Sequence, residues 1–144
     1  MATITFNNQK VAFLLRDKRR LKTFLHSVFL NENVDFSSLS YIFCTDEFLL
    51  KLNQQYLNHD TLTDILTFNL TGPGLPIISE IYISIERVFE NAEIMKTTFL
   101  DELYRVMIHG ILHLCGYNDH TVVEKEVMKL KEDFYLGQFI KCST

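Results

Sequence analysis

Four segments of the chain are dominated by β-branched and aromatic residues or by alternation of apolar with polar positions, and each predicts a β-strand. The last of them, "IISEIYIS", has the clearest two-residue period. The four predicted strands are Ile4 to Phe6, Ser38 to Cys44, Thr63 to Leu70 and Ile77 to Ser84.

Five other segments repeat apolar residues every three or four positions, which predicts amphipathic helices. Thr45 or Asp46 is placed to cap the second helix and Ser84 the third, while Gly116 follows the fourth where a terminating glycine is common. The five predicted helices are about Arg16 to Leu30, Thr45 or Asp46 to Tyr56, Ile85 to Lys96, Phe99 to Cys115 and Val122 to Leu136.

The order of these elements predicts an α+β fold in which helices cover a small mixed β-sheet of about four strands. Helices follow strands in the first half, and a helical C-terminal half follows the last strand. A length of 144 residues suits one domain with one core. The strongest break is the turn Gly72-Pro73-Gly74, so we expect a single domain over residues 1–144.

Charge narrows the possible partners. The net charge of −4 does not indicate a protein that binds nucleic acid over a broad surface, so a polyanion would have to meet a local patch. The clearest patch is the basic cluster Arg16 to Lys22, "RDKRRLK". Its simplest interpretation is the solvated face of a helix.

The cysteines and the apolar runs bear on the compartment. Cys44, Cys115 and Cys142 are odd in number and form no CxxC pair, which favours a reducing environment over a disulfide framework. The N-terminus lacks the pattern of a signal peptide, and no apolar run approaches the roughly 18 residues that span a bilayer. We expect a soluble, cytoplasmic protein without a membrane partner.

The candidate chemistry lies in "MIHGILHLCGYNDH", Met107 to His120. His109 and His113 are four residues apart, so on a helix their imidazoles share one face and can reach one metal ion at about 2.0–2.1 Å. Gly116 lets the chain reverse, which can return a third donor from Asp119 or His120. A histidine pair alone is more often structural than metal-binding, but the glycine turn and the third donor favour a metal site.

Gly110 and Cys115 restrict this site further. In zinc peptidases a glutamate follows the first histidine and acts as the general base, whereas this chain has Gly110 there. A peptidase is therefore disfavoured, and the glycine is expected to let a substrate or another backbone approach the metal. Cys115 is a possible ligand, but an inward-packed thiol is the simpler interpretation.

The motif "HGILHLCGYNDH" resembles the signature H-G-x-L-H-L-x-G-Y-D-H of the YbeY family of bacterial endoribonucleases, also called rRNA maturation factors. Three further segments resemble that family in the same order, so the likeness covers the chain from about Leu52 to Leu136. They are "LNQQYLNHDTLTDILTF", "SEIYIS" and "EVMKLKEDFYL".

The resemblance implies a metal-dependent, single-strand-specific endoribonuclease in 16S rRNA 3′-end maturation and ribosome quality control. It implies a layered fold with a zincin-like metal cleft, one Zn²⁺ ion, and a cytoplasmic location. The implied partners are single-stranded RNA, above all rRNA, and the ribosome or small-subunit proteins, with no role for DNA. His109 and His113 match the first two metal ligands of the family.

Two departures from the family affect the site residues. Asn118 is an extra residue, so the third ligand is Asp119 if spacing is kept, or His120 if the extra residue loops out; fixed spacing from Gly116 favours Asp119. The family's Tyr-Arg pair appears as Tyr56-Leu57. We therefore consider two other residues for phosphate contact, although structural or solvated roles are simpler for both: His59 and Arg105.

The resulting hypothesis is an enzyme with His109, His113, Arg105 and His59 as candidate catalytic residues. A zinc ion held by the two motif histidines and the third ligand keeps a position open for water and lowers the pKa of that water towards about 7. The basic cluster would hold the RNA backbone. One rival is a non-catalytic ribosome-associated factor whose structural zinc is closed by four ligands, and a weaker rival is a zinc peptidase.

Overall fold

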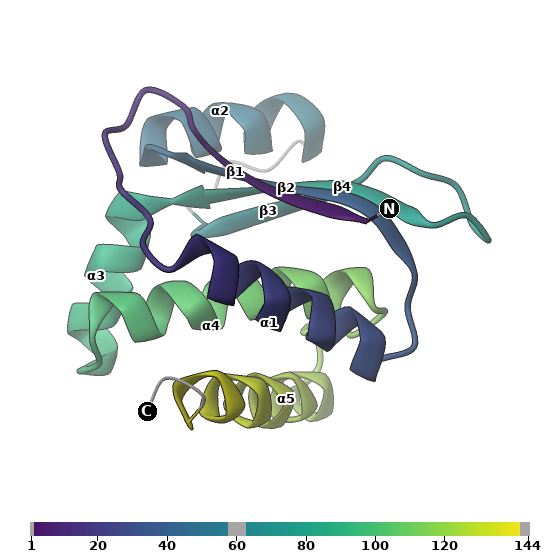
Figure 1. Ribbon diagram of the computed structural model, residues 1–144. Coiled ribbons are helices and arrows are strands. Elements are labelled where there is room, and N and C mark those ends of the chain that lie inside the picture. Colours follow the sequence, from purple (N-terminus) through teal and green to yellow (C-terminus); the bar gives the residue numbers. More distant parts are fainter. Residues whose placement is uncertain (1, 58–62, 142–144) are drawn as a thin grey trace.

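The structure, a computed structural model, describes residues 2–57 and 63–141 and contains one four-stranded sheet. Helix α2 lies on one side of this sheet, and α1, α4 and α5 lie on the other, with α5 outermost (Figure 1). The strands are β1 (Thr3–Asn8), β2 (Phe36–Cys44), β3 (Ile65–Asn69) and β4 (Ile77–Ser84). The helices are α1 (Lys18–Asn31), α2 (Asp46–Leu57), α3 (Ile85–Met95), α4 (Phe99–Leu114) and α5 (Val122–Lys141).

The strand order is β1-β2-β4-β3, with β1, β2 and β4 parallel and β3 antiparallel to β4. The expected α+β fold with a mixed sheet of four strands is therefore confirmed. Strand β3 lies at one edge of this sheet, and β4 is its one neighbouring strand among the described residues. The loop that contains Gly72-Pro73-Gly74 connects β3 to β4 as a hairpin, because β4 returns antiparallel beside β3.

Alternation along the strands divides the apolar side chains between two cores. The larger core lies between the sheet and helices α1, α4 and α5, and includes Leu39, Tyr41 and Phe43 from β2. The smaller core lies under α2 and contains Cys44, Leu49 and Leu66. None of the helices in residues 2–57 and 63–141 is long and apolar enough to cross a membrane.

The predicted helix caps are present where polar side chains bond to backbone amides. The Ser84 hydroxyl accepts from the Arg87 amide at 3.1 Å and begins α3, and the Thr45 hydroxyl accepts from the Phe48 amide at 3.1 Å and begins α2. Helix α5 continues to Lys141, five residues beyond its predicted end at Leu136. Burial of Phe139 in the main core accounts for this extension through Gly137.

Helix α4 packs closely against the sheet at Gly110. A Cβ atom at this position would lie 2.8 Å from Cδ1 of Ile81 and 3.1 Å from Cδ1 of Ile65. The buried Tyr41 hydroxyl also donates to the Met107 carbonyl at 2.9 Å, which ties the same stretch of α4 to β2. The expectation that Gly110 admits a substrate or another backbone is thus corrected: side chains of the sheet occupy the space beside it.

Enlarging Gly110 is therefore expected to destabilise the fold. Gly110→Val adds atoms inside a filled core, so we expect a loss of about 1–3 kcal/mol in the free energy of unfolding, measured by chemical denaturation. The matched control is Gly137→Val in α5, where a Cβ would meet nothing within 4 Å. There the change is expected to stay within about 0.5 kcal/mol. Equal stability of the two variants would contradict this packing.

Candidate metal centre

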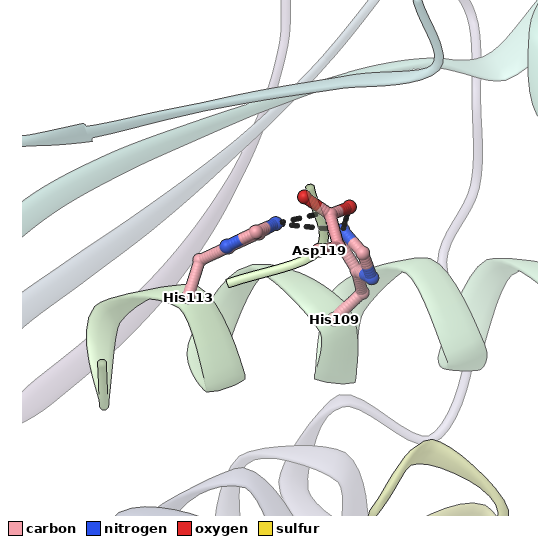
Figure 2. A group of neighbouring side chains, drawn as sticks. All are labelled: His109, His113 and Asp119. Atoms are coloured by element: carbon pink, nitrogen blue, oxygen red, sulfur yellow. Dashed lines mark hydrogen bonds and ion pairs between the residues drawn. The ribbon is translucent and has the colours of Figure 1, made fainter. Parts of the chain in front are cut away.

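His109 and His113 project from the same side of α4, one turn apart, and Asp119 meets them from the chain that follows the helix (Figure 2). The two Nε2 atoms are 2.9 Å apart. Oδ2 of Asp119 lies 3.4 Å from Nε2 of His109 and 3.6 Å from Nε2 of His113. One donor atom from each of the three residues falls within 4.8 Å of the others, which suits a shared metal ion.

The end of α4 explains why Asp119 returns to the histidines. Gly116 has φ +102°, the left-handed conformation that glycine adopts without strain. Its amide donates to the His113 carbonyl at 3.0 Å, and the Tyr117 amide donates to the Leu112 carbonyl at 3.0 Å. These are the two hydrogen bonds of a Schellman motif, which reverses the chain after a helix.

The structure separates the two residues considered for the third ligand. Asp119 belongs to the donor group with the two histidines, whereas His120 does not. His120 lines the same cleft, and its amide donates to Oε1 of Glu124 at 3.2 Å. Glu124 also forms a reciprocal capping box with Thr121, which fixes the start of α5 directly after the site.

Each histidine is held through its other ring nitrogen. Nδ1 of His113 lies 2.8 Å from the Tyr117 carbonyl, which can only accept, so this nitrogen carries the proton. Nδ1 of His109 lies 2.6 Å from Oε2 of Glu132, a carboxylate that is 11% exposed. Both arrangements leave Nε2 as the metal-facing atom, the outer contact pattern usual for zinc-binding histidines. The donor set and its supports therefore fit a metal ion.

Arg105 takes part in this support. Its Nη1 donates to Oε1 of Glu132 at 3.0 Å and its Nη2 to Oδ1 of Asp133 at 2.6 Å. The guanidinium is thus paired with two carboxylates and holds the one that orients His109. The other residue considered for phosphate contact, His59, lies outside the described residues.

The donor group lies in a cleft of about 740 Å³ between β3 and α4. Arg105 is the one lysine or arginine among the described residues that line it, and the basic cluster Arg16 to Lys22 does not reach it. Within that cluster, Arg20 lies over the Phe139 ring and Lys22 over the Phe6 ring. The lining residues are Thr63, Asp64, Ile65, Leu66, Thr67, Asn69, Glu102, Arg105, Val106, His109, His113, Leu114, Asn118, Asp119, His120 and Glu132.

Burial changes the proton affinity of three further groups at or near the cleft. It raises the pKa of Asp64 and of Glu102 above their usual values, and the negative charge of Asp64 raises that of Glu102 further. It also raises the pKa of the Cys115 thiol to about 12. Cys115 does not belong to the donor group found among the described residues and packs against the larger core, so it is a packed side chain.

No sequence motif marks a role for Glu132, although its position in the helix gives a signal. Met128, Tyr135 and Phe139 mark the buried face of α5, and Glu132 falls on that same face. A carboxylate among core positions needs a partner, and here the partners are His109 and Arg105.

Comparisons with known proteins show what this chain is similar to. The family model described as "Endoribonuclease YbeY" matches residues 3–140. A protein named endoribonuclease YbeY from Amoebophilus asiaticus is 46% identical over 94% of this chain and 92% of its own length. Its namesake from Flavobacterium psychrophilum is 48% identical over 92% of this chain and 94% of its own length. The solution structure of TM1509 from Thermotoga maritima superposes with a TM-score of 0.63 at 29% identity, covering 96% of this chain and 92% of that one.

Metal affinity at this site is expected to rise with pH. Burial opposes protonation of His109, but the Glu132 carboxylate outweighs it and raises the pKa above the ordinary value of 6.5. Burial and the nearby His109 lower the pKa of His113, so that ring loses its proton at a lower pH than His109 does. Metal must therefore displace a proton from His109, and affinity should climb until the pH exceeds the pKa of His109.

Competition with a chromogenic chelator across mildly acidic to mildly alkaline pH measures this dependence. In Glu132→Gln the carboxylate that raises the pKa is gone, so the rise in affinity should occur at lower pH than in the unmodified protein. An affinity that is flat across this range, or a rise at the same pH in both proteins, would contradict the assignment.

Proposed function

This chain belongs to the YbeY family of endoribonucleases, which are involved in 16S rRNA maturation, and we propose that it cuts single-stranded RNA at a zinc ion held by His109, His113 and Asp119. The observation that carries this proposal is the convergence of two imidazole Nε2 atoms and one carboxylate oxygen in a cleft. Two nitrogens and one oxygen suit zinc, and three protein ligands leave one position open, as in catalytic zinc sites.

The chain's own residues prepare this site. A bound zinc ion supplies a Lewis acid for the phosphodiester and a water of lowered pKa. Glu132 and the Tyr117 carbonyl fix the two imidazoles, and Arg105 fixes Glu132. Two carboxyl groups of the cleft, Asp64 and Glu102, have pKa values raised in the direction of neutral pH. A group transfers protons most effectively during hydrolysis when its pKa is near the working pH.

The composition of the cleft supports a single-stranded substrate. Its hydroxyl and amide groups, on Thr63, Thr67, Asn69 and Asn118, suit hydrogen bonds to unpaired bases and to phosphate oxygens. Its one guanidinium is already paired with carboxylates, so the charge that attracts a scissile phosphate would come from the metal. The proposal extends to the 3′ end of 16S rRNA, to association with the ribosome or its small-subunit proteins, and to the cytoplasm as the place of action.

The two rival functions find less support. A structural zinc site would need a fourth protein ligand, and the donor group found among the described residues has three members. A zinc peptidase would need a general base after His109, and Gly110 instead faces Ile81 and Ile65 of the sheet. Both observations favour the nuclease.

Substitution of the two residues considered for the third ligand tests the site. Asp119→Ala removes a donor, so we expect zinc content to fall well below one ion per chain and cleavage of single-stranded RNA to drop by about a hundredfold or more. His120→Ala is the matched control, because the neighbouring residue lines the cleft without joining the donor group, and it should retain one zinc ion. Elemental analysis and an RNA cleavage assay with a chelator arm provide the measurements.

Two outcomes would count against the proposal. Loss of zinc from His120→Ala with retention in Asp119→Ala would move the third ligand to His120. Full RNA cleavage by metal-free His113→Ala would show that the reaction does not use this site.

A further inference from the structure

Glu32, the residue directly after α1, carries a carboxylate that is largely shielded from solvent and bonded to the turn after α4. Its side chain is 9% exposed and receives three hydrogen bonds. The Tyr117 hydroxyl donates to Oε1 at 2.7 Å, Nζ of Lys131 donates to Oε2 at 3.2 Å, and the Tyr135 hydroxyl donates to Oε2. One carboxylate therefore joins the end of α1, the turn after α4, and α5.

This carboxylate is held in its charged form. Burial alone would raise the pKa of Glu32, but the hydrogen bonds from Tyr135, Tyr117 and Lys131 outweigh it and bring the pKa below its usual value. Hydrogen bonds to a charged acceptor are stronger than those to a neutral one, so the Glu32 carboxylate holds each of its three donors firmly. The Lys131 ammonium also lies 5.3 Å from the centre of the Tyr117 ring.

The single residue Tyr117 contacts both the Glu32 carboxylate and a histidine of the metal centre. Its hydroxyl bonds to Glu32, while its carbonyl accepts from Nδ1 of His113 at 2.8 Å. Tyr117 also lies two residues before Asp119, in the turn that brings that carboxylate to the histidines. Fixing the Tyr117 side chain therefore fixes both the carbonyl that orients one ligand and the backbone that carries another.

We propose that Glu32 is a positioning residue for the metal centre, acting through the Tyr117 hydroxyl to hold the ring of His113 and the turn that presents Asp119. It touches neither the donor atoms nor the cleft surface, and it lies 77 residues before the first motif histidine, His109. The inference rests on the proposed function, because it assumes that the donor group binds zinc.

The two tyrosines provide a matched pair for the test. Tyr117→Phe and Tyr135→Phe each remove one hydroxyl from the same carboxylate, but only Tyr117 belongs to the turn of the metal centre. The measurement is transfer of zinc from the loaded full-length protein to a chelator. We expect Tyr117→Phe to weaken zinc binding by about tenfold, the low end of the range for outer contacts, and Tyr135→Phe to stay within about twofold.

A merely structural role for Glu32 predicts a different pattern. In that case both substitutions would lower the midpoint of unfolding and would change zinc affinity alike, and this result would overturn the inference. Glu32→Gln gives a second measurement, since it keeps the shape of the side chain and removes its charge. It should weaken zinc binding at least as much as Tyr117→Phe, and an affinity equal to that of the unmodified protein would also overturn the inference.

Failure of the underlying function is recognised separately. If the unmodified protein holds less than stoichiometric zinc at this site, the proposed zinc site itself is wrong, and with it the positioning role. If the unmodified protein binds zinc tightly and the two tyrosine variants behave alike, only the role of Glu32 is wrong.

Discussion

The position of α4 between the sheet and α5 determines the geometry of the whole site. On one side, Gly110 allows the helix to approach β4 so closely that side chains of the sheet fill the space a larger residue would need. On the other side, Glu132 of α5 reaches Nδ1 of His109 at 2.6 Å. His109 and Gly110 are adjacent in the chain but have different roles. Packing at Gly110 orients α4 against the sheet, and His109 then faces the cleft beside the edge strand β3.

Two buried carboxylates fix the orientation of the histidines that α4 presents. Glu132 and Glu32 both lie in the interior, and each is paired with cations or hydroxyl donors that offset the cost of burying its charge. Each also connects to a different histidine, Glu132 directly and Glu32 by way of Tyr117. The orientation of both imidazole rings, and so of the two Nε2 atoms, therefore depends on groups from three other segments: the end of α1, the turn after α4, and α5. Such preorganisation lets a metal bind without reordering the ligands.

Local patterns in the sequence were enough to predict the four strands, the five helices, the Ser84 cap and the glycine turn, because each depends on residues near one another in the chain. The same holds for His109 and His113, whose shared face follows from helix geometry alone. Fixed spacing from Gly116 favours Asp119 over His120, but both residues carry suitable donors, and the path of the turn was needed to separate them. Glu32 and Glu132 act on the site over separations of 85 and 23 residues, which no local pattern encodes. The same limit applies to Gly110, because its neighbour Ile81 comes from another element.

The ligands of the bound metal decide whether this site is the one described. A crystal structure of the zinc-loaded protein, with anomalous scattering to identify the ion, would show every side chain that touches it. We expect one zinc ion bound by Nε2 of His109, Nε2 of His113 and a carboxylate oxygen of Asp119, with no fourth protein ligand. Zinc bound by His120 in place of Asp119, or closed off by a fourth side chain, would contradict this expectation.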